Sequence, residues 1–389
     1  MIDFTLDKDL ERLRERVRDF VETVVIPRED ELVRDLEKLE ALRAELQKAA
    51  KEEGLFLPQL PEELGGLGLD WRQTAVILEE AGRSLYGPQA LNSSAPDEGN
   101  MHLIYHAGSE EQKERYLGPM TRGEIRSCFA MTEPAPGAGS DPSLLSSTAE
   151  RKDGRWVING NKWFITGAEG AEFAIALVRA PEGPTMFLVD TDNPGFHLRR
   201  TISTMDTLTP GGHGQIDFVD CAVDEDAVLG EVGKGFEYAQ IRLDPARLTH
   251  CMRWLGAAVR SMEIASRYAV ERESFGSKLS EHQSVQWMVA DSHAEMHAAR
   301  LMIWHAAWKL DQGERIKQEA SMTKVFVSET VDRVIDRALQ ICGSLGVSED
   351  VPVSHFYREA RPFRIYDGPS EVHRGAVARR IFKRVAEDG

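Results

Sequence analysis

The segment Tyr366-Asp367-Gly368-Pro369 offers a carboxylate that could act as a general base. A carboxylate can accept a proton, and burial in an apolar pocket would raise its pKa by up to a few units. The same residues also fit a simple turn, because Asp-Gly is a turn dipeptide and proline is favoured in the first turn of a helix. Taken alone, the segment leaves both interpretations open.

A second group of candidate polar contacts lies in residues 130–141 and in the strand-like run that follows. Thr132 and Ser140 could donate hydrogen bonds, and the glycines between them allow the main chain to approach a ligand closely. The spacing fits neither a dinucleotide-binding G-x-G-x-x-G nor a Walker loop. Phe164 could cover a flat π system while Thr166 bonds to its heteroatom. A glycine-rich turn followed by a packed barrel strand is the simpler alternative.

The surrounding chain divides into three stretches of different texture. In residues 1–125 apolar side chains recur at three- and four-residue steps, which indicates helices. Residues 126–232 contain short β-rich runs separated by turn pairs such as Asp153-Gly154 and Asn159-Gly160, which favours an antiparallel barrel or sandwich. Residues 233–389 contain four long helical stretches with short connections: 236–272, 281–312, 314–341 and 369–386.

These textures predict an α+β fold that is mostly α. The expected order is an N-terminal all-helical domain (1–125), a middle antiparallel β domain (126–232) and a C-terminal four-helix bundle (233–389). With 389 residues the chain is long enough for two or three packed domains and a buried cofactor.

Composition excludes several classes of partner. The 64 acidic and 47 basic side chains give a net charge of −17, which repels polyanions, so nucleic acid is not an expected partner. No run of apolar residues is long enough to span a membrane. The four cysteines are far apart, so neither a metal site nor a disulfide framework is expected. No leader pattern is seen, and we expect a cytoplasmic protein, with an organelle matrix as the alternative.

The first candidate segments resemble the flavin-contacting half of acyl-CoA dehydrogenases: Met-Thr-Glu-Pro…Gly-Ala-Gly-Ser-Asp (131–141), then Asn-Gly-x-Lys-x-x-Ile-Thr (159–166). By that resemblance Met131 and Thr132 contact the edge of the flavin ring of FAD. Phe164 and Thr166 line its other side, with Thr166 near N5, and Ser140 lies near the CoA thioester arm. Two departures are a loop that is longer by two residues and a phenylalanine where a tryptophan is common.

A further segment, Arg272-Glu273-Ser274-Phe275-Gly276 followed by Glu281-His282-Gln283, reads by itself as a break between two helices. It also resembles the part of the family that reaches the FAD of a neighbouring subunit. By that resemblance Arg272 pairs with the pyrophosphate, and Phe275 and Gln283 flank the adenosine. Gln340 and Gly343 match other FAD contacts across subunits. The resemblance therefore implies a homodimer or homotetramer with an FAD site shared between subunits.

The Asp367 segment resembles a branch of the same family whose catalytic base is aspartate instead of glutamate. This branch includes the dehydrogenase domains of mammalian acyl-CoA dehydrogenase family members ten and eleven. The resemblance makes Asp367 the base, with Arg247 close enough to hold it ionised and oriented, and places Tyr366 and Gly368 at the substrate. His250 and His373 could belong to the same pocket, although a structural role for both histidines is the simpler alternative.

The resemblance implies FAD-dependent α,β-dehydrogenation of an acyl-CoA to the trans-2-enoyl-CoA. Asp367 would take the α-proton, flavin N5 would take the β-hydride, and the electrons would pass to an electron-transfer flavoprotein in fatty acid metabolism. Three alternatives stay open. They are a flavin oxidase of the same fold, a dehydrogenase of a carrier-protein-bound or modified (branched or hydroxylated) acyl group, and a non-enzymatic flavoprotein scaffold. The acyl chain length is not predicted.

Overall fold

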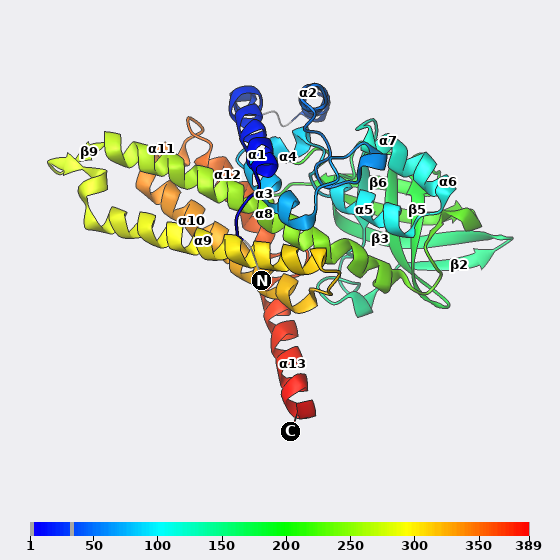
Figure 1. The fold of residues 1–389 in the computed structure, drawn as a ribbon. Helices are drawn as coiled ribbons and strands as arrows, with labels where there is room; N and C mark the ends of the chain where they lie inside the picture. Colours follow the sequence, from blue (N-terminus) through cyan, green and yellow to red (C-terminus); the bar gives the residue numbers. More distant parts are fainter. Residues whose placement is uncertain (1–3, 32–34, 389) are drawn as a thin grey trace.

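The computed structural model describes residues 4–31 and 35–388, arranged as helices, a β-sheet domain and a second set of helices (Figure 1). Residues 1–3 and 389, on which the expectation of no leader pattern partly rests, lie outside the described residues. The helices before the sheet are α1 (Lys8–Phe20), α2 (Leu36–Glu52), α3 (Trp71–Ala81), α4 (Gly87–Ala90), α5 (Asp97–Ala107), α6 (Glu110–Gln112) and α7 (Gly118–Thr121).

The starts of these helices follow local capping chemistry. Helix α1 begins after Asp7, whose carboxylate accepts main-chain hydrogen bonds from the first turn. Helix α3 begins with a reciprocal capping box between Asp70 and Gln73. In addition, the carboxylate of Asp311 accepts the main-chain N–H of Trp71 at 2.7 Å, and so links α3 to the C-terminal helices. The N-terminal helices are thus fixed against the rest of the molecule.

The middle region forms one mixed sheet with the strand order β6-β7-β3-β2-β4-β5-β8, and β1 pairs with β4. Most pairs are antiparallel, as predicted, but β1 and β2 each pair with β4 in parallel. The antiparallel pair β3–β7 brings Thr166 opposite His213. The strands are β1 (Ser127–Ala130), β2 (Thr148–Lys152), β3 (Arg155–Thr166), β4 (Phe173–Ala180), β5 (Gly183–Asp190), β6 (Phe196–Ile202), β7 (His213–Val223) and β8 (Val228–Leu229).

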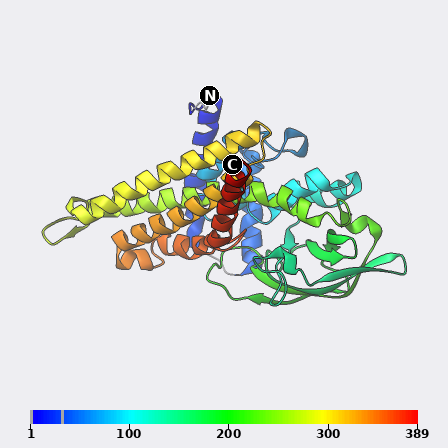
Figure 2. The same cartoon turned by 90° about the horizontal axis from the view of Figure 1, so that it is seen from below.

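Long helices α8, α9 and α10 lie side by side, while α13 projects away from them (Figures 1 and 2). A short hairpin of strands β9 and β10 extends from the far end of this bundle. The sequence predicted the four long helices but not α12. The elements are α8 (Gly235–Glu271), β9 (Glu273–Ser274), β10 (Ser277–Lys278), α9 (Gln283–Asp311), α10 (Lys317–Cys342), α11 (Ser344–Val347), α12 (Val353–Ala360) and α13 (Ser370–Asp388).

Helices α3 and α8 cross at two glycines with their main chains in contact. A Cβ atom on Gly82 would lie 1.9 Å from the carbonyl oxygen of Arg253, and one on Gly256 would lie 2.0 Å from that of Glu79. Because any larger residue would separate the helices, glycine at this crossing holds α8 at a fixed distance from the N-terminal helices. None of the helices within residues 4–31 and 35–388 has both the length and the apolar character needed to cross a bilayer.

Candidate functional site

A cavity of about 800 Å³ lies where the three regions meet. Its wall combines the loop after β1, the end of β3, one face of α8 and the turn before α13. Residues far apart in the sequence therefore surround one space. Eleven of the residues singled out from the sequence line it: Met131, Thr132, Ser140, Phe164, Thr166, Arg247, His250, Tyr366, Asp367, Gly368 and His373.

The turn that carries Asp367 has an unusual backbone that is held from several directions. Asp367 has φ of 53° and Gly368 has φ of 99°, and a Cβ on Gly368 would lie 2.6 Å from a ring nitrogen of His373. Arg247 Nε donates to the main-chain oxygen of Asp367 at 2.9 Å, and His373 Nε2 donates to the same oxygen at 3.0 Å. Lys324 Nζ donates to the oxygen of Gly368 at 2.7 Å. Side chains of α8, α10 and α13 thus fix the turn.

The Asp367 side chain is only 17% exposed, and its Oδ2 atom is buried. Its Oδ2 atom has no hydrogen-bond partner within the described part of the chain, and the nearest charged or ionisable nitrogen is His250 Nε2 at 3.4 Å. Arg247 was expected to hold this carboxylate, but its ion pair is with Asp244 at 2.7 Å. Arg247 therefore orients the main chain of Asp367, and the carboxylate oxygen stays available to a ligand.

A chain of hydrogen bonds fixes the imidazole of His250. Trp254 Nε1 donates to the Tyr366 hydroxyl at 2.6 Å, and that hydroxyl lies 3.4 Å from His250 Nδ1. Arg253, which can only donate, lies 3.3 Å from the same nitrogen. Burial lowers the pKa of His250 to about 3, so the ring is neutral near pH 7. Its hydrogen is therefore on Nε2, facing Asp367.

The expected direction of the Asp367 pKa shift is wrong. Burial alone would raise the pKa, but neighbouring positive groups outweigh it and hold the pKa below the ordinary aspartate value. Those groups are His250, Arg242, Arg247 and Lys324. Since His250 is neutral near pH 7, the effect there rests on the two arginines and on Lys324, whose pKa burial lowers only to about 8. Asp367 is therefore ionised at neutral pH.

A buried ion pair holds the loop that contributes Met131 and Thr132. Lys162 Nζ donates to Glu133 Oε1 at 2.8 Å and to the main-chain oxygen of Met131 at 3.1 Å. The second carboxylate oxygen of Glu133 accepts from the main-chain N–H and the hydroxyl of Ser146, each at 2.7 Å. Both charged side chains are fully buried. This network gives the glycine-rich loop a defined conformation, which a simple surface turn would lack.

Both aromatic residues at the end of β3, Trp163 and Phe164, line the cavity. Phe164 has φ of 51° and 46% of its surface exposed, although it is apolar. The main-chain N–H of Trp163 donates to the oxygen of Thr132 at 3.0 Å, and the two rings lie 4.9 Å apart. An exposed ring on the wall of a cavity is suited to cover a flat ligand.

A polar relay behind Thr166 was not found in the sequence. The Thr166 hydroxyl lies 3.0 Å from His213 Nδ1, and His213 Nε2 lies 2.8 Å from Asp206 Oδ2. All three residues line the cavity. His213 stands in no recognisable motif, and only its strand register opposite Thr166 could have indicated it.

The structure places the remaining predicted cofactor residues elsewhere. All are exposed and lie toward the far end of the bundle, away from the sheet (Figures 1 and 2). Phe275, at the tip of the β9–β10 hairpin, is 98% exposed. Within one chain these residues do not approach the cavity. They are Arg272, Phe275, Gln283, Gln340 and Gly343.

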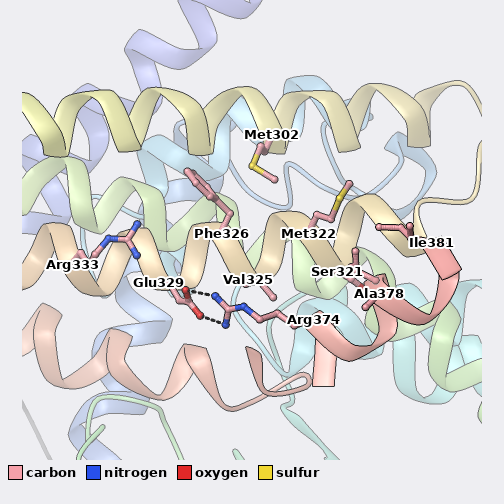
Figure 3. Close-up of a pocket in the computed structure, with 11 residues that line it drawn as sticks. Met302, Ser321, Met322, Val325, Phe326, Glu329, Arg333, Arg374, Ala378 and Ile381 are labelled. Atoms are coloured by element: carbon pink, nitrogen blue, oxygen red, sulfur yellow. Dashed lines mark hydrogen bonds and ion pairs between the residues drawn. The ribbon is translucent and has the colours of Figure 1, made fainter. Parts of the chain in front are cut away.

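A second cavity of about 410 Å³ lies between α9, α10 and α13 (Figure 3). Its wall is mainly apolar, with Met302, Met322 and Phe326, and at one side Arg374 forms an ion pair with Glu329 at 2.6 Å. None of the residues predicted from the sequence lies there. The described residues also contain no cluster of histidine, cysteine, aspartate or glutamate arranged to hold a metal ion.

Comparison with known proteins identifies the family. Profiles of three domains of acyl-CoA dehydrogenases match this chain: the N-terminal domain over residues 7–124, the middle domain over 128–221 and the C-terminal domain over 233–382. The chain belongs to the acyl-CoA dehydrogenase family. The predicted fold class, with helical, β and helical parts, is thereby confirmed.

Individual relatives agree with this assignment. The chain is 39% identical to acyl-CoA dehydrogenase family member 11 of Gallus gallus over 86% of its own length and 44% of that protein. It is 38% identical to the probable acyl-CoA dehydrogenase FadE2 of Mycobacterium tuberculosis over 86% of this chain and 84% of that one. Butyryl-CoA dehydrogenase from Megasphaera elsdenii superimposes with a TM-score of 0.85 at 28% identity, covering 98% and 100% of the two chains. The chain spans less than half the length of the family-member-11 protein.

Proposed function

We propose that this chain is an FAD-dependent oxidoreductase that converts an acyl-CoA thioester to its trans-2-enoyl form, with Asp367 as the base. Family membership supports the reaction class. The observation that carries the proposal for the base is the Asp367 carboxylate, which lies at the cavity and has a buried oxygen, Oδ2, without a hydrogen-bond partner among the described residues. A carboxylate in this state can accept a proton from a ligand without first breaking a bond to the protein.

The cavity wall has the chemistry that an isoalloxazine ring requires. Phe164 and Met131 offer apolar surface for a flat ring, and the hydroxyls of Thr132 and Thr166 offer hydrogen bonds to polar ring edges. These four residues would hold FAD in the cavity. When bound, FAD supplies a two-electron acceptor for the hydrogen that leaves the β-carbon as hydride.

The residues of the chain provide the proton chemistry around that acceptor. Arg242, Arg247 and Lys324 keep Asp367 ionised, and the clamped turn fixes where its carboxylate lies. The neutral ring of His250 presents Nε2–H near Oδ2 and limits the orientations of the carboxylate. With FAD and an acyl group bound, side chains from all three regions would surround the reacting carbons and limit the access of water.

The proposal extends to the assembly and the electron acceptor. Arg272, Phe275 and Gln283 lie exposed at the far end of the bundle, so they would reach the FAD of a second copy in a homodimer or homotetramer. The ring of Phe275, 98% exposed at the tip of the hairpin, is accessible for such a contact. The electrons would then leave to an electron-transfer flavoprotein.

The test is an anaerobic titration of the purified flavoprotein with acyl-CoAs that have short, long, branched and hydroxylated chains. We expect at least one to bleach the visible flavin band. A protein that carries FAD but is bleached by no thioester would overturn the proposal. After reduction, admission of air distinguishes the acceptor, since slow reoxidation with substrate bound supports a dehydrogenase and rapid peroxide formation indicates an oxidase.

A further inference from the structure

The relay Asp206–His213–Thr166 has a fixed direction. Asp206 is ionised at neutral pH because, although burial raises its pKa, the hydrogen bond from His213 holds the pKa below its ordinary value. An ionised carboxylate only accepts hydrogen bonds, so the 2.8 Å contact requires a hydrogen on His213 Nε2. In the neutral imidazole Nδ1 is then a bare acceptor.

The state of Nδ1 determines what Thr166 can do. The Thr166 hydroxyl lies 3.0 Å from that nitrogen, so toward the neutral imidazole it donates its only hydrogen. Its oxygen keeps lone pairs and no further hydrogen. Because Thr166 lines the cavity, it presents an acceptor to whatever is bound there.

We propose that the Asp206–His213 pair makes Thr166 a hydrogen-bond acceptor that favours the reduced, N–H-bearing form of a flavin bound in the cavity. This inference rests on the proposed function. Reduction adds hydrogen to flavin ring nitrogens, and an acceptor beside such a nitrogen stabilises the N–H form over the form with a bare lone pair. His213 and Asp206 are thus positioning residues that act through Thr166.

The surroundings keep the relay in place. Thr166 and His213 are paired residues of β3 and β7, so the sheet sets their spacing. His213 and Asp206 have side chains only 14% and 12% exposed, so water competes little for their hydrogen bond. Glu359 on α12 accepts the main-chain N–H of Thr207 at 2.6 Å and ties the loop that carries Asp206 to the helical region.

The experiment measures the midpoint potential of the bound flavin in the FAD-loaded enzyme, by dye-equilibrated reduction at one mildly alkaline pH. The variants are Thr166→Val, His213→Leu and their combination, with His197→Leu on the exposed edge strand as the matched control. We expect each single variant to lower the equilibrium constant for flavin reduction about tenfold, which corresponds to a midpoint potential lower by about 30 mV for a two-electron couple. The double variant should lower it no further, since both changes remove one interaction.

Asp206→Asn provides a second test if His213→Leu does not fold. The asparagine amide can donate a hydrogen bond to Nε2, so the hydrogen of His213 is no longer held on that nitrogen. This variant should also lower the potential. Potentials equal to that of the parent in Thr166→Val and Asp206→Asn would overturn the inference, as would additive shifts in the double variant. A flavoprotein that is bleached by acyl-CoA but shows no shift overturns this inference alone. A chain that takes up no FAD overturns both the inference and the proposed function.

Discussion

Arg247 Nε donates a 2.9 Å hydrogen bond to the main-chain carbonyl oxygen of Asp367. The guanidinium thus acts on the backbone that carries the carboxylate, while its charge still acts on the carboxylate through space. Orientation and ionisation of the proposed base are therefore two separable effects of one side chain, and different substitutions should separate them.

Arg247→Lys keeps the charge but cannot reproduce the fork that spans Asp244 and the Asp367 carbonyl. We expect flavin reduction by acyl-CoA to slow by roughly 10- to 100-fold, the equivalent of one charge-assisted hydrogen bond. Arg247→Gln removes the charge as well, so the pKa of Asp367 should rise. The acid limb in the pH dependence of flavin reduction should then also move to higher pH. Stopped-flow reduction as a function of pH measures both effects, and identical profiles for the two variants would contradict the separation.

Asp367→Asn removes the proposed base without changing its size. We expect the protein to retain FAD and its flavin reduction to slow by several orders of magnitude, at or beyond the upper end of the 10²- to 10⁴-fold range typical of a lost general base. The measurement is anaerobic single-turnover reduction with a substrate that bleaches the parent. Asp192→Asn, at an exposed turn, is the matched control and should react like the parent. Reduction of Asp367→Asn at the parent rate would mean that another group takes the proton.

The pH dependence should follow the lowered pKa of Asp367. The carboxylate works as a base above its pKa, and that pKa lies below the ordinary value of 3.8. The rate of flavin reduction should therefore show no acid limb from this group at pH 5 to 7. A limb near pH 6 that disappears in Asp367→Asn would show that burial outweighs the neighbouring cations.

Glu359 should make stability depend on pH. Burial raises its pKa from 4.5 to about 7. Between these values the unfolded chain has lost the proton and the folded chain has kept it, so folding stability falls as pH rises through this window, by roughly 3 kcal/mol. Glu359→Gln should remove this decrease, whereas Glu182→Gln on an exposed turn should not. Denaturant unfolding at pH 5 and pH 7.5 measures the difference, and parallel curves for parent and Glu359→Gln would refute it.

Sequence patterns predicted the helical, β and helical order because apolar periodicity and turn residues are local signals. The motif residues that surround the cavity, such as Thr132, Thr166 and Asp367, could be named since each stands in a short recognisable segment. The direction of the Asp367 pKa shift could not be predicted. It depends on the charges of Arg242 and Lys324, which the packing of α8 and α10 brings near Asp367. The domain limits at residues 125 and 232 stay a prediction.

His213 illustrates the same limit. Its place in the chain, after two glycines, suggests only a turn. Its link to Thr166 arises from strand register, and its link to Asp206 arises from the fold of the loop between β6 and β7. No fixed spacing in the sequence marks a side chain that acts through a neighbour in this way.

The glycine crossing of α3 and α8 has a consequence for the choice among acyl groups. Gly82 and Gly256 leave no gap between the two backbones, so these helices cannot slide apart to admit a bulkier chain without losing their contact. Leu85, just after α3, and Trp254 on α8 both line the main cavity. Discrimination by chain size is therefore expected to depend on the volumes of such side chains, and hinge-like opening between α3 and α8 should contribute little.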